Sequence, residues 1–344
     1  MIEKSLWVKT DLTIYEMEAL SEEIMIMTTA IETRPYGNTG ERVTVIGLGG
    51  APLGKHSFAS GVATVHRALE LGITYFDTSP GYGTGVSQAI YGEALAGRKE
   101  AYVLATKVGY LREPRLFRSP EALHAQIRET LQVLRRDHVD VLQIHECDWR
   151  RWWSDKPPHD GRFDLHQDYD FANAPIMQVL QEAKAQGLCR FIGITGNSTD
   201  ETAHVLRHVD VDTYLVAFNY NLIWRDARRE ALPLAREKNA ATILGALFHG
   251  GRLTAVHPEW LQSPPAWMTP EIRAHFEQLY ALQRDCGLSL VELTVRFLIG
   301  DPEVTTIPVG ATTPKELEES VAAAQQGPLP PDLHQAVEAI GLPY

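Results

Sequence analysis

Four ionisable side chains stand at places in the sequence where they could form one proton-transfer site. Asp77, Lys107 and His145 each follow directly after a short apolar run that is typical of a buried strand, and Tyr82 comes shortly after Asp77. A single charged residue at a strand end is more often structural than functional. Three successive strands that each end in one form a pattern that chance rarely produces.

Together these side chains suit proton exchange with a carbonyl or alcohol oxygen. A tyrosine phenol has an ordinary pKa of about 10, which is too high for efficient acid–base work at neutral pH. A lysine ammonium beside Tyr82 favours the phenolate and lowers that pKa, while the Asp77 carboxylate keeps Lys107 charged and in place. His145 could donate a hydrogen bond to the carbonyl oxygen. Since no metal-binding motif is visible, we expect an organic cofactor to supply the hydride.

These residues need a scaffold that brings several strand ends together. From residue 44 onward, short β-branched runs alternate with amphipathic stretches, which indicates repeated β–α units and a parallel sheet. We predict eight strands, at Thr44–Leu48, Ile73–Phe76, Tyr102–Thr106, Val139–Ile144, Arg190–Ile194, Thr213–Ala217, Thr242–Ala246 and Val304–Pro308. Eight such units predict the α/β class and a (β/α)8 TIM barrel, which carries its chemistry at the carboxyl ends of the strands. The alternative is an open doubly wound sheet, but no G-x-G-x-x-G motif follows the first strand.

Further segments flank or interrupt the eight units. Residues 1–30 are predicted to be a dispensable N-terminal extension, and residues 31–344 a single barrel. A hairpin within Ile31–Val43 is expected to plug the barrel floor, and Pro331–Ile340 to form an extra C-terminal helix. Residues 149–174 are too long for an ordinary connection, and their aromatic content predicts an ordered insert.

Composition and charge restrict the class of protein. Of the 344 residues, 44% are hydrophobic and 22% charged, which argues against long disorder. The formal net charge of −12 disfavours a nucleic-acid partner, because a phosphate backbone would be repelled. No apolar run reaches the roughly 18 residues of a membrane span, and the acidic start fits neither a secretory nor an organellar signal. Three distant cysteines favour a reducing compartment, so we expect a cytoplasmic protein without a metal site or a membrane partner.

The motifs around the ionisable residues resemble the aldo-keto reductase superfamily. They are Phe76-Asp77-Thr78-Ser79-Pro80-Gly81-Tyr82-Gly83, Ala105-Thr106-Lys107-Val108 and Leu142-Gln143-Ile144-His145. The similarity covers roughly residues 33 to 325 and implies an NAD(P)-dependent oxidoreductase that binds its cofactor without a Rossmann motif. It also implies that Tyr82 is the general acid/base. Lys107 and Asp77 would be its tuning pair, and His145 would orient the substrate.

Two later segments resemble the nicotinamide side of the family's cofactor site, with departures. Gly193-Ile194-Thr195-Gly196-Asn197 stands where the family commonly has Gly-x-Ser-Asn, so Thr195 keeps the hydroxyl and Asn197 is the candidate amide. Leu247 follows a later strand and is a further cofactor-binding candidate. At these positions the sequence resembles the branch of L-galactose, L-fucose and D-arabinose dehydrogenases. Members of that branch oxidise aldoses at the anomeric carbon to lactones.

A segment near the end of the chain resembles the family's adenosine-phosphate site. Its cofactor-binding candidates are Gly310, Thr312, Glu316, Glu319 and Ser320. Relatives that prefer NADP often carry arginine at the position of Glu316. A carboxylate there would repel a 2′-phosphate and accept a hydrogen bond from a 2′-hydroxyl, as the acidic residue of NAD-binding Rossmann sites does. We therefore expect NAD(H), with NADP(H) as the alternative because Lys315 lies next to Glu316.

Substrate choice is expected to reside in the insert. Trp149, Trp152 and Trp153 follow His145 closely. Tryptophan faces commonly pack on the C–H surfaces of sugars, and an acidic group such as Asp148 could bind hydroxyls. The alternative is that the tryptophans anchor a surface loop.

These observations predict an enzyme, an NAD-linked aldose 1-dehydrogenase that acts on a small-molecule sugar or carbonyl compound. Two alternatives stay open. One is an NADPH-dependent general aldehyde or ketone reductase, and the other is a non-catalytic, cofactor-sensing regulatory subunit.

Overall fold

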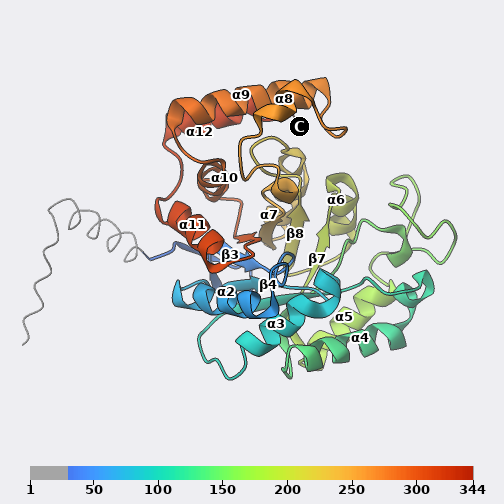
Figure 1. The fold of residues 1–344 in the computed structure, drawn as a ribbon. Coiled ribbons are helices and arrows are strands. Elements are labelled where there is room, and N and C mark those ends of the chain that lie inside the picture. The colour runs from blue at the N-terminus through green and yellow to red at the C-terminus, as the bar shows by residue number, and fades with distance from the viewer. Residues whose placement is uncertain (1–29, 344) are drawn as a thin grey trace, which may run out of the picture. The chain divides into compact units, whose positions relative to one another are not determined.

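A barrel of parallel strands forms the centre of the computed structural model, which describes residues 30–343 (Figure 1). Its strands are β3 (Ile46–Gly49), β4 (Tyr75–Asp77), β5 (Val103–Val108), β6 (Val139–Ile144), β7 (Cys189–Gly196), β8 (Thr213–Ala217), β9 (Ala241–Gly245) and β10 (Ile307–Val309). Strand neighbours follow chain order, and β10 pairs with β3. A parallel bridge from Ile243 to Thr306 closes the ring. The predicted α/β barrel and its eight strands are therefore confirmed, whereas residues 1–29 of the expected extension lie outside the described residues.

The expected hairpin is also present, as β1 (Thr33–Pro35) paired antiparallel with β2 (Arg42–Thr44). The first barrel strand begins later than predicted, because Thr44 belongs to the hairpin and pairs with Thr33. Tyr36, between the two hairpin strands, is fully buried in the cluster of side chains that also holds Tyr75 of β4. The hairpin therefore closes the end of the barrel where the strands begin.

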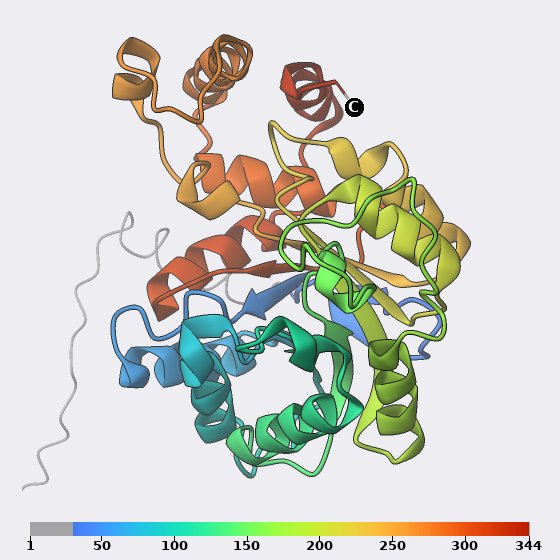
Figure 2. The same cartoon turned by 90° about the vertical axis from the view of Figure 1, so that its right-hand side faces the viewer.

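Helices surround the barrel and alternate with its strands. They are α2 (Phe58–Glu70), α3 (Val86–Ala94), α4 (Pro120–Val133), α5 (Pro175–Ala185), α6 (Thr199–His208), α7 (Ala231–Glu237), α10 (Leu290–Ile299) and α11 (Pro314–Gln325). Figures 1 and 2 show α2 to α5 gathered on one side of the barrel. On the opposite side lie α8 (Pro258–Gln262), α9 (Pro270–Cys286) and the expected C-terminal helix α12 (Pro331–Ile340), which packs on α9. Within residues 30–343, no helix has the length and apolar character needed to cross a membrane.

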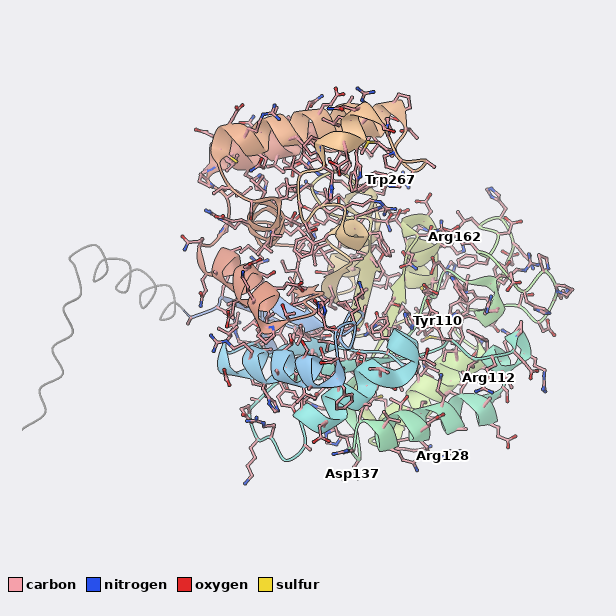
Figure 3. The ribbon with its side chains drawn as sticks, in the orientation of Figure 1. Tyr110, Arg112, Arg128, Asp137, Arg162 and Trp267 are labelled. Atoms are coloured by element: carbon pink, nitrogen blue, oxygen red, sulfur yellow. The ribbon has the colours of Figure 1, made fainter. Side chains whose placement is uncertain are left out.

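Residues 149–174 form an insert between β6 and α5 that is anchored by the buried side chains of Trp152, Trp153, Phe163 and Phe171, while residues 155–158 are exposed. It contains the short helix η3 (Arg150–Trp152), and a bridge joins Trp149 to Arg162. The buried ring of Phe171 stacks on His208 of α6 at 5.3 Å between centroids. Figure 3 labels Arg162 on this insert, and also Tyr110 on the segment that follows β5.

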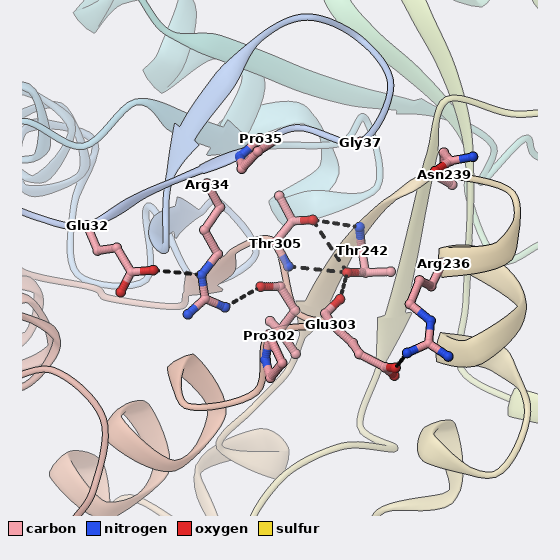
Figure 4. A pocket seen from close by; sticks show the side chains of 12 residues that line it. Glu32, Arg34, Pro35, Gly37, Arg236, Asn239, Thr242, Pro302, Glu303 and Thr305 are labelled. Carbon is pink, nitrogen blue, oxygen red and sulfur yellow. Dashed lines mark hydrogen bonds and ion pairs between the residues drawn. The ribbon is translucent and has the colours of Figure 1, made fainter.

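A cavity of about 480 Å³ opens at the floor of the barrel, between the hairpin and the starts of β9 and β10 (Figure 4). Its polar lining is largely paired: Arg34 donates to Glu32 and to backbone carbonyls near Val304, and Arg236 pairs with Glu303. Polar groups at this end of a barrel usually serve stability, whereas chemistry occurs at the other end. The cavity is therefore distinct from the site formed by the strand ends.

Candidate active site

The carboxyl ends of three adjacent strands bring the ionisable residues together. Asp77 is the last residue of β4, Lys107 is next to last in β5, and His145 directly follows β6. The three strands are paired in parallel, so these ends lie at the same rim. Tyr82 begins η1 (Tyr82–Gly85), the short helix that leads from β4 into α3.

Lys107 and Asp77 form a buried ion pair. The Lys107 Nζ lies 2.5 Å from Asp77 Oδ1 and donates a second hydrogen bond to the Thr78 carbonyl at 2.9 Å. Gln143 Nε2 donates to the other carboxylate oxygen at 3.3 Å. Only 1% of Lys107 and 3% of Asp77 is exposed. Charges so deeply buried are tolerated because each one is paired and hydrogen-bonded.

The charges of this pair stabilise each other against the loss of water. Burial raises the pKa of Asp77, and the Lys107 ammonium opposes that rise. Burial alone would lower the pKa of Lys107, but Asp77 and Tyr82 together more than compensate and raise it above its ordinary value. Lys107 therefore stays charged at neutral pH.

The Tyr82 ring lies over this ammonium, with 4.6 Å between Lys107 Nζ and the ring centroid. Loss of solvent raises the pKa of Tyr82, Lys107 lowers it, and the net result is a pKa above the ordinary value. The predicted direction of the Lys107 effect is correct, but the expected net lowering is wrong because burial outweighs the lysine. The Tyr82 hydroxyl thus keeps its proton at neutral pH and can donate it.

His145 lies beside Tyr82, with the two rings edge to face and their centroids 5.5 Å apart. Its Nδ1 is 2.8 Å from Oγ of Ser79, which also accepts a hydrogen bond from the Gly81 N–H at 3.0 Å. All of these groups are satisfied when the Ser79 hydroxyl donates to Nδ1, which leaves the imidazole proton on Nε2. Burial and the Lys107 charge hold the pKa of His145 well below its ordinary value. His145 is therefore a neutral hydrogen-bond donor.

The nicotinamide-side candidates lie next to His145, with one exception. Thr195 is buried in β7, and its Oγ1 accepts from the Glu146 N–H at 3.1 Å. Asn197 Nδ2 donates to Glu146 Oε1 at 2.6 Å. Leu247 is only 1% exposed and packs into the main hydrophobic core. The Leu247 side chain therefore faces the core, and the role of this residue in cofactor binding stays a prediction.

The adenosine-side candidates surround the start of α11. Thr313 caps the helix by accepting from the Glu316 N–H, and Glu316 Oε2 accepts from the N–H and the hydroxyl of Thr312, at 2.7 and 2.8 Å. Glu316 and Glu319 are exposed. Ser320 is buried, and its hydroxyl donates to the Glu316 carbonyl of its own helix. The Ser320 hydroxyl is therefore paired within its own helix, and its contact with a cofactor stays a prediction.

This region suits the phosphates of a dinucleotide. In barrel enzymes, phosphate groups commonly bind at the loops after the last two strands and at a helix N-terminus, where backbone N–H groups point outward. Here Gly310 is exposed between β10 and α11, and a Cβ at this position would approach Pro52 to 3.2 Å. The loop thus has helical N–H donors nearby and little room for a side chain, which fits a nicotinamide dinucleotide.

The insert tryptophans do not all line the site. Trp152 is fully buried, and its Nε1 donates to the carbonyls of His145 and Glu146 at 3.2 and 3.1 Å. Trp153 is 5% exposed and donates to the Cys147 carbonyl at 2.6 Å. Both side chains hold the backbone that follows β6, which corrects their assignment to substrate stacking and supports the alternative that they anchor the loop. Trp149 is half-buried and remains a candidate for contact with substrate.

Asp148 also differs from expectation. It is 1% exposed, and its Oδ2 accepts from the Asn197 N–H at 3.3 Å and lies 3.7 Å from Nε of Arg162. Its Oδ1 faces Gly196, where an added Cβ would come within 3.1 Å. Burial raises the pKa of Asp148 to about 6. This carboxylate ties the insert to β7 and is not placed to bind substrate hydroxyls.

Two residues at the rim were not predicted from the sequence. Tyr110 is 49% exposed, and its ring lies 4.6 Å from His145 and 5.9 Å from Trp149. Its hydroxyl donates to Glu146 Oε1 at 3.1 Å. Their positions in the sequence could have identified them, because Tyr110 closely follows Lys107 and Glu146 is adjacent to His145. No group of three or more His, Cys, Asp or Glu residues among the described ones could hold a metal ion.

Comparison with known proteins supplies the family context for this geometry. The model of the Aldo/keto reductase family matches residues 45–341. L-galactose dehydrogenase from Arabidopsis thaliana is 31% identical over 310 residues, which cover 87% of this chain and 89% of that protein. D-threo-aldose 1-dehydrogenase from Pseudomonas sp is 25% identical over 76% of this chain and 82% of its own. The solved holo form of AKR11C1 from Bacillus halodurans shares the fold, with a TM-score of 0.72, 22% identity, and coverage of 90% of this chain and 96% of that one.

Proposed function

The chain belongs to the aldo/keto reductase family of oxidoreductases, and we propose that it oxidises aldoses at the anomeric carbon with NAD as the acceptor. The observation that carries this proposal is the Tyr82 ring above the buried Lys107–Asp77 pair, with His145 at its edge. Similarity to L-galactose dehydrogenase over most of the chain supports the choice of an aldose.

Each rim residue has a defined task in this proposal. Tyr82 exchanges a proton with the oxygen on the reacting carbon, and the charge of Lys107 opposes the rise in the pKa of Tyr82 that burial causes. Asp77 holds Lys107 charged, and neutral His145 donates from Nε2 to the same oxygen. A bound nicotinamide dinucleotide supplies the hydride chemistry. Thr195 and Asn197 would hold its nicotinamide end, and the Gly310–Glu316 segment its adenosine end.

The proposed reaction can be tested by offering NAD and NADP with a panel of aldoses, pyridoxal and simple aldehydes. We expect an aldose with NAD to give the highest kcat/KM, at least tenfold above the simple aldehydes. Preferred reduction of simple aldehydes with NADPH would instead support the general reductase. Cofactor binding without turnover of any compound would support the regulatory subunit.

Ser79 provides a first test of the site, because the tautomer inferred for His145 depends on the hydrogen bond between His145 Nδ1 and the Ser79 hydroxyl. We expect Ser79→Ala to lower kcat by about 10- to 100-fold, the effect of losing one well-placed hydrogen bond in the transition state. In nitrogen-15 NMR spectra, His145 should lose its uniform Nε2–H form. Ser87→Ala is a matched control, since that buried hydroxyl bonds to Thr78. An unchanged imidazole spectrum in Ser79→Ala would contradict the assignment.

Glu316 provides a test of cofactor preference. In Glu316→Arg, a guanidinium replaces a carboxylate, so we expect the ratio of NADP to NAD affinity to rise at least tenfold. Fluorescence titration with NADH and NADPH measures this ratio directly. Glu121→Arg, which makes the same change at an exposed position in the first turn of α4, should change it much less. An equal response of the two variants would show that the position of the added charge does not matter.

A further inference from the structure

The carboxylate of Glu146 is buried but incompletely paired. Its Oε1 accepts hydrogen bonds from the Tyr110 hydroxyl and from Asn197 Nδ2, at 3.1 and 2.6 Å. Its Oε2 has no hydrogen-bond partner among the described residues. Only 9% of Glu146 is exposed, and burial raises its pKa. A buried polar atom without a partner is costly, so such an atom in a native site calls for a specific explanation.

The position of Glu146 places this carboxylate at the reacting end of the barrel. It follows His145 directly, and its partner Tyr110 packs on the His145 ring at 4.6 Å. The negative charge of Glu146 is one of the influences that raise the pKa of Tyr82, so the two groups are electrostatically coupled. The backbone of Glu146 has φ of 60°, a left-handed conformation that non-glycine residues rarely adopt. Such conformations cluster at functional sites, where surrounding contacts maintain them.

We propose that Glu146 Oε2 accepts a hydrogen bond from a hydroxyl next to the reacting carbon of the substrate. The site would therefore take hydroxylated carbonyl compounds in preference to plain aldehydes. An ionised carboxylate can only accept, and a hydroxyl is the neutral donor that a sugar offers. A site built to bind a substrate hydroxyl rejects the analogue without it, because the protein group is then left unpaired. This inference deepens the proposed aldose oxidation by naming the residue that recognises the hydroxyl.

The neighbouring acid, Asp148, provides a matched contrast. Its Oδ1 also has no hydrogen-bond partner among the described residues. Asp148 Oδ1 lies against the backbone of Gly196. Asp148 Oδ2 accepts a hydrogen bond from the Asn197 N–H and lies near the Arg162 guanidinium. The charge of Asp148 acts on Tyr110 through space, but no hydrogen bond joins Asp148 to Tyr110 or His145 among the described residues. Asp148 therefore shares the burial and charge of Glu146 without its place at the rim.

The experiment compares glyceraldehyde with propanal, which has the same carbon chain without hydroxyls, in the reductive direction with NADH. We expect the wild-type enzyme to have the higher kcat/KM for glyceraldehyde. In Glu146→Gln, the ratio of the two kcat/KM values should fall about tenfold, since a neutral hydrogen bond replaces a charge-assisted one. Asp148→Asn should leave the ratio unchanged. Thermal unfolding and the Kd of NADH should also be unchanged in Glu146→Gln.

Three results would overturn this assignment. The wild-type enzyme could show no preference for glyceraldehyde, or Glu146→Gln could lower kcat/KM equally for both aldehydes. A weakened affinity of Glu146→Gln for NADH would identify the cofactor as the partner of Glu146. A different outcome would contradict the proposed aldose oxidation without contradicting the role of Glu146. If no aldose is oxidised but the glyceraldehyde preference depends on Glu146, the hydroxyl subsite stands and the aldose assignment does not.

Discussion

Replacing Tyr82 with phenylalanine is expected to lower kcat by about 10²- to 10⁴-fold, the range for loss of a general acid/base. The change removes only the hydroxyl, so the ring that lies 4.6 Å from Lys107 Nζ is retained. Binding of NADH should therefore stay close to that of the wild-type enzyme. Steady-state kinetics and fluorescence titration of the same preparation measure the two effects.

Tyr102→Phe is the matched control for this variant. Tyr102 directly precedes β5, at the opposite end of the strand from the site, and its hydroxyl contacts Arg136. Removal of the Tyr102 hydroxyl should leave kcat near the wild-type value. If Tyr82→Phe retained most of its turnover, another group would have to transfer the proton.

Replacing Lys107 with methionine is expected to remove turnover and to destabilise the fold by about 3–5 kcal/mol, because it leaves Asp77 charged and buried without its partner. The double variant Lys107→Met/Asp77→Asn should recover much of that stability and none of the turnover. Urea unfolding of the two single variants and the double variant forms a thermodynamic cycle for the pair.

The stability of Lys107→Met should also depend on pH in a defined direction. Burial already raises the pKa of Asp77 in the presence of Lys107, and removal of the ammonium raises it further. The folded variant then binds a proton more tightly than the unfolded chain. Its deficit relative to wild type should shrink as pH falls through the raised pKa of Asp77 and be largest at neutral pH. A deficit that grew on acidification would contradict this account.

The arrangement of Asp77, Lys107 and His145 was predictable because it depends on simple periodic features. Each residue follows a buried run, and the ends of neighbouring parallel strands lie together in any closed barrel. The helix α12 was predicted with the correct bounds for a similar reason, since Pro331 marks its first turn.

The parts that were not predictable depend on contacts between segments far apart in the sequence. Nothing in the run of insert tryptophans distinguishes Trp149, at the rim, from buried Trp152, because the insert has no helical or strand period. The net pKa of Tyr82 depends on the balance between burial and Lys107, which a motif does not reveal. Glu146 was missed because its importance comes from the partners that its two oxygens have or lack.

The anchoring of the insert has a consequence for engineering and evolution. Trp152 holds the carbonyl of His145 itself, so the insert is part of the support of the catalytic rim as well as a border of the pocket. In many barrels, loops can be exchanged to alter selectivity while the chemistry is conserved. In this chain, a transplanted insert without an indole at position 152 would change turnover together with selectivity. Directed evolution should therefore find new substrates more readily through Tyr110 and Trp149 than through wholesale replacement of the insert.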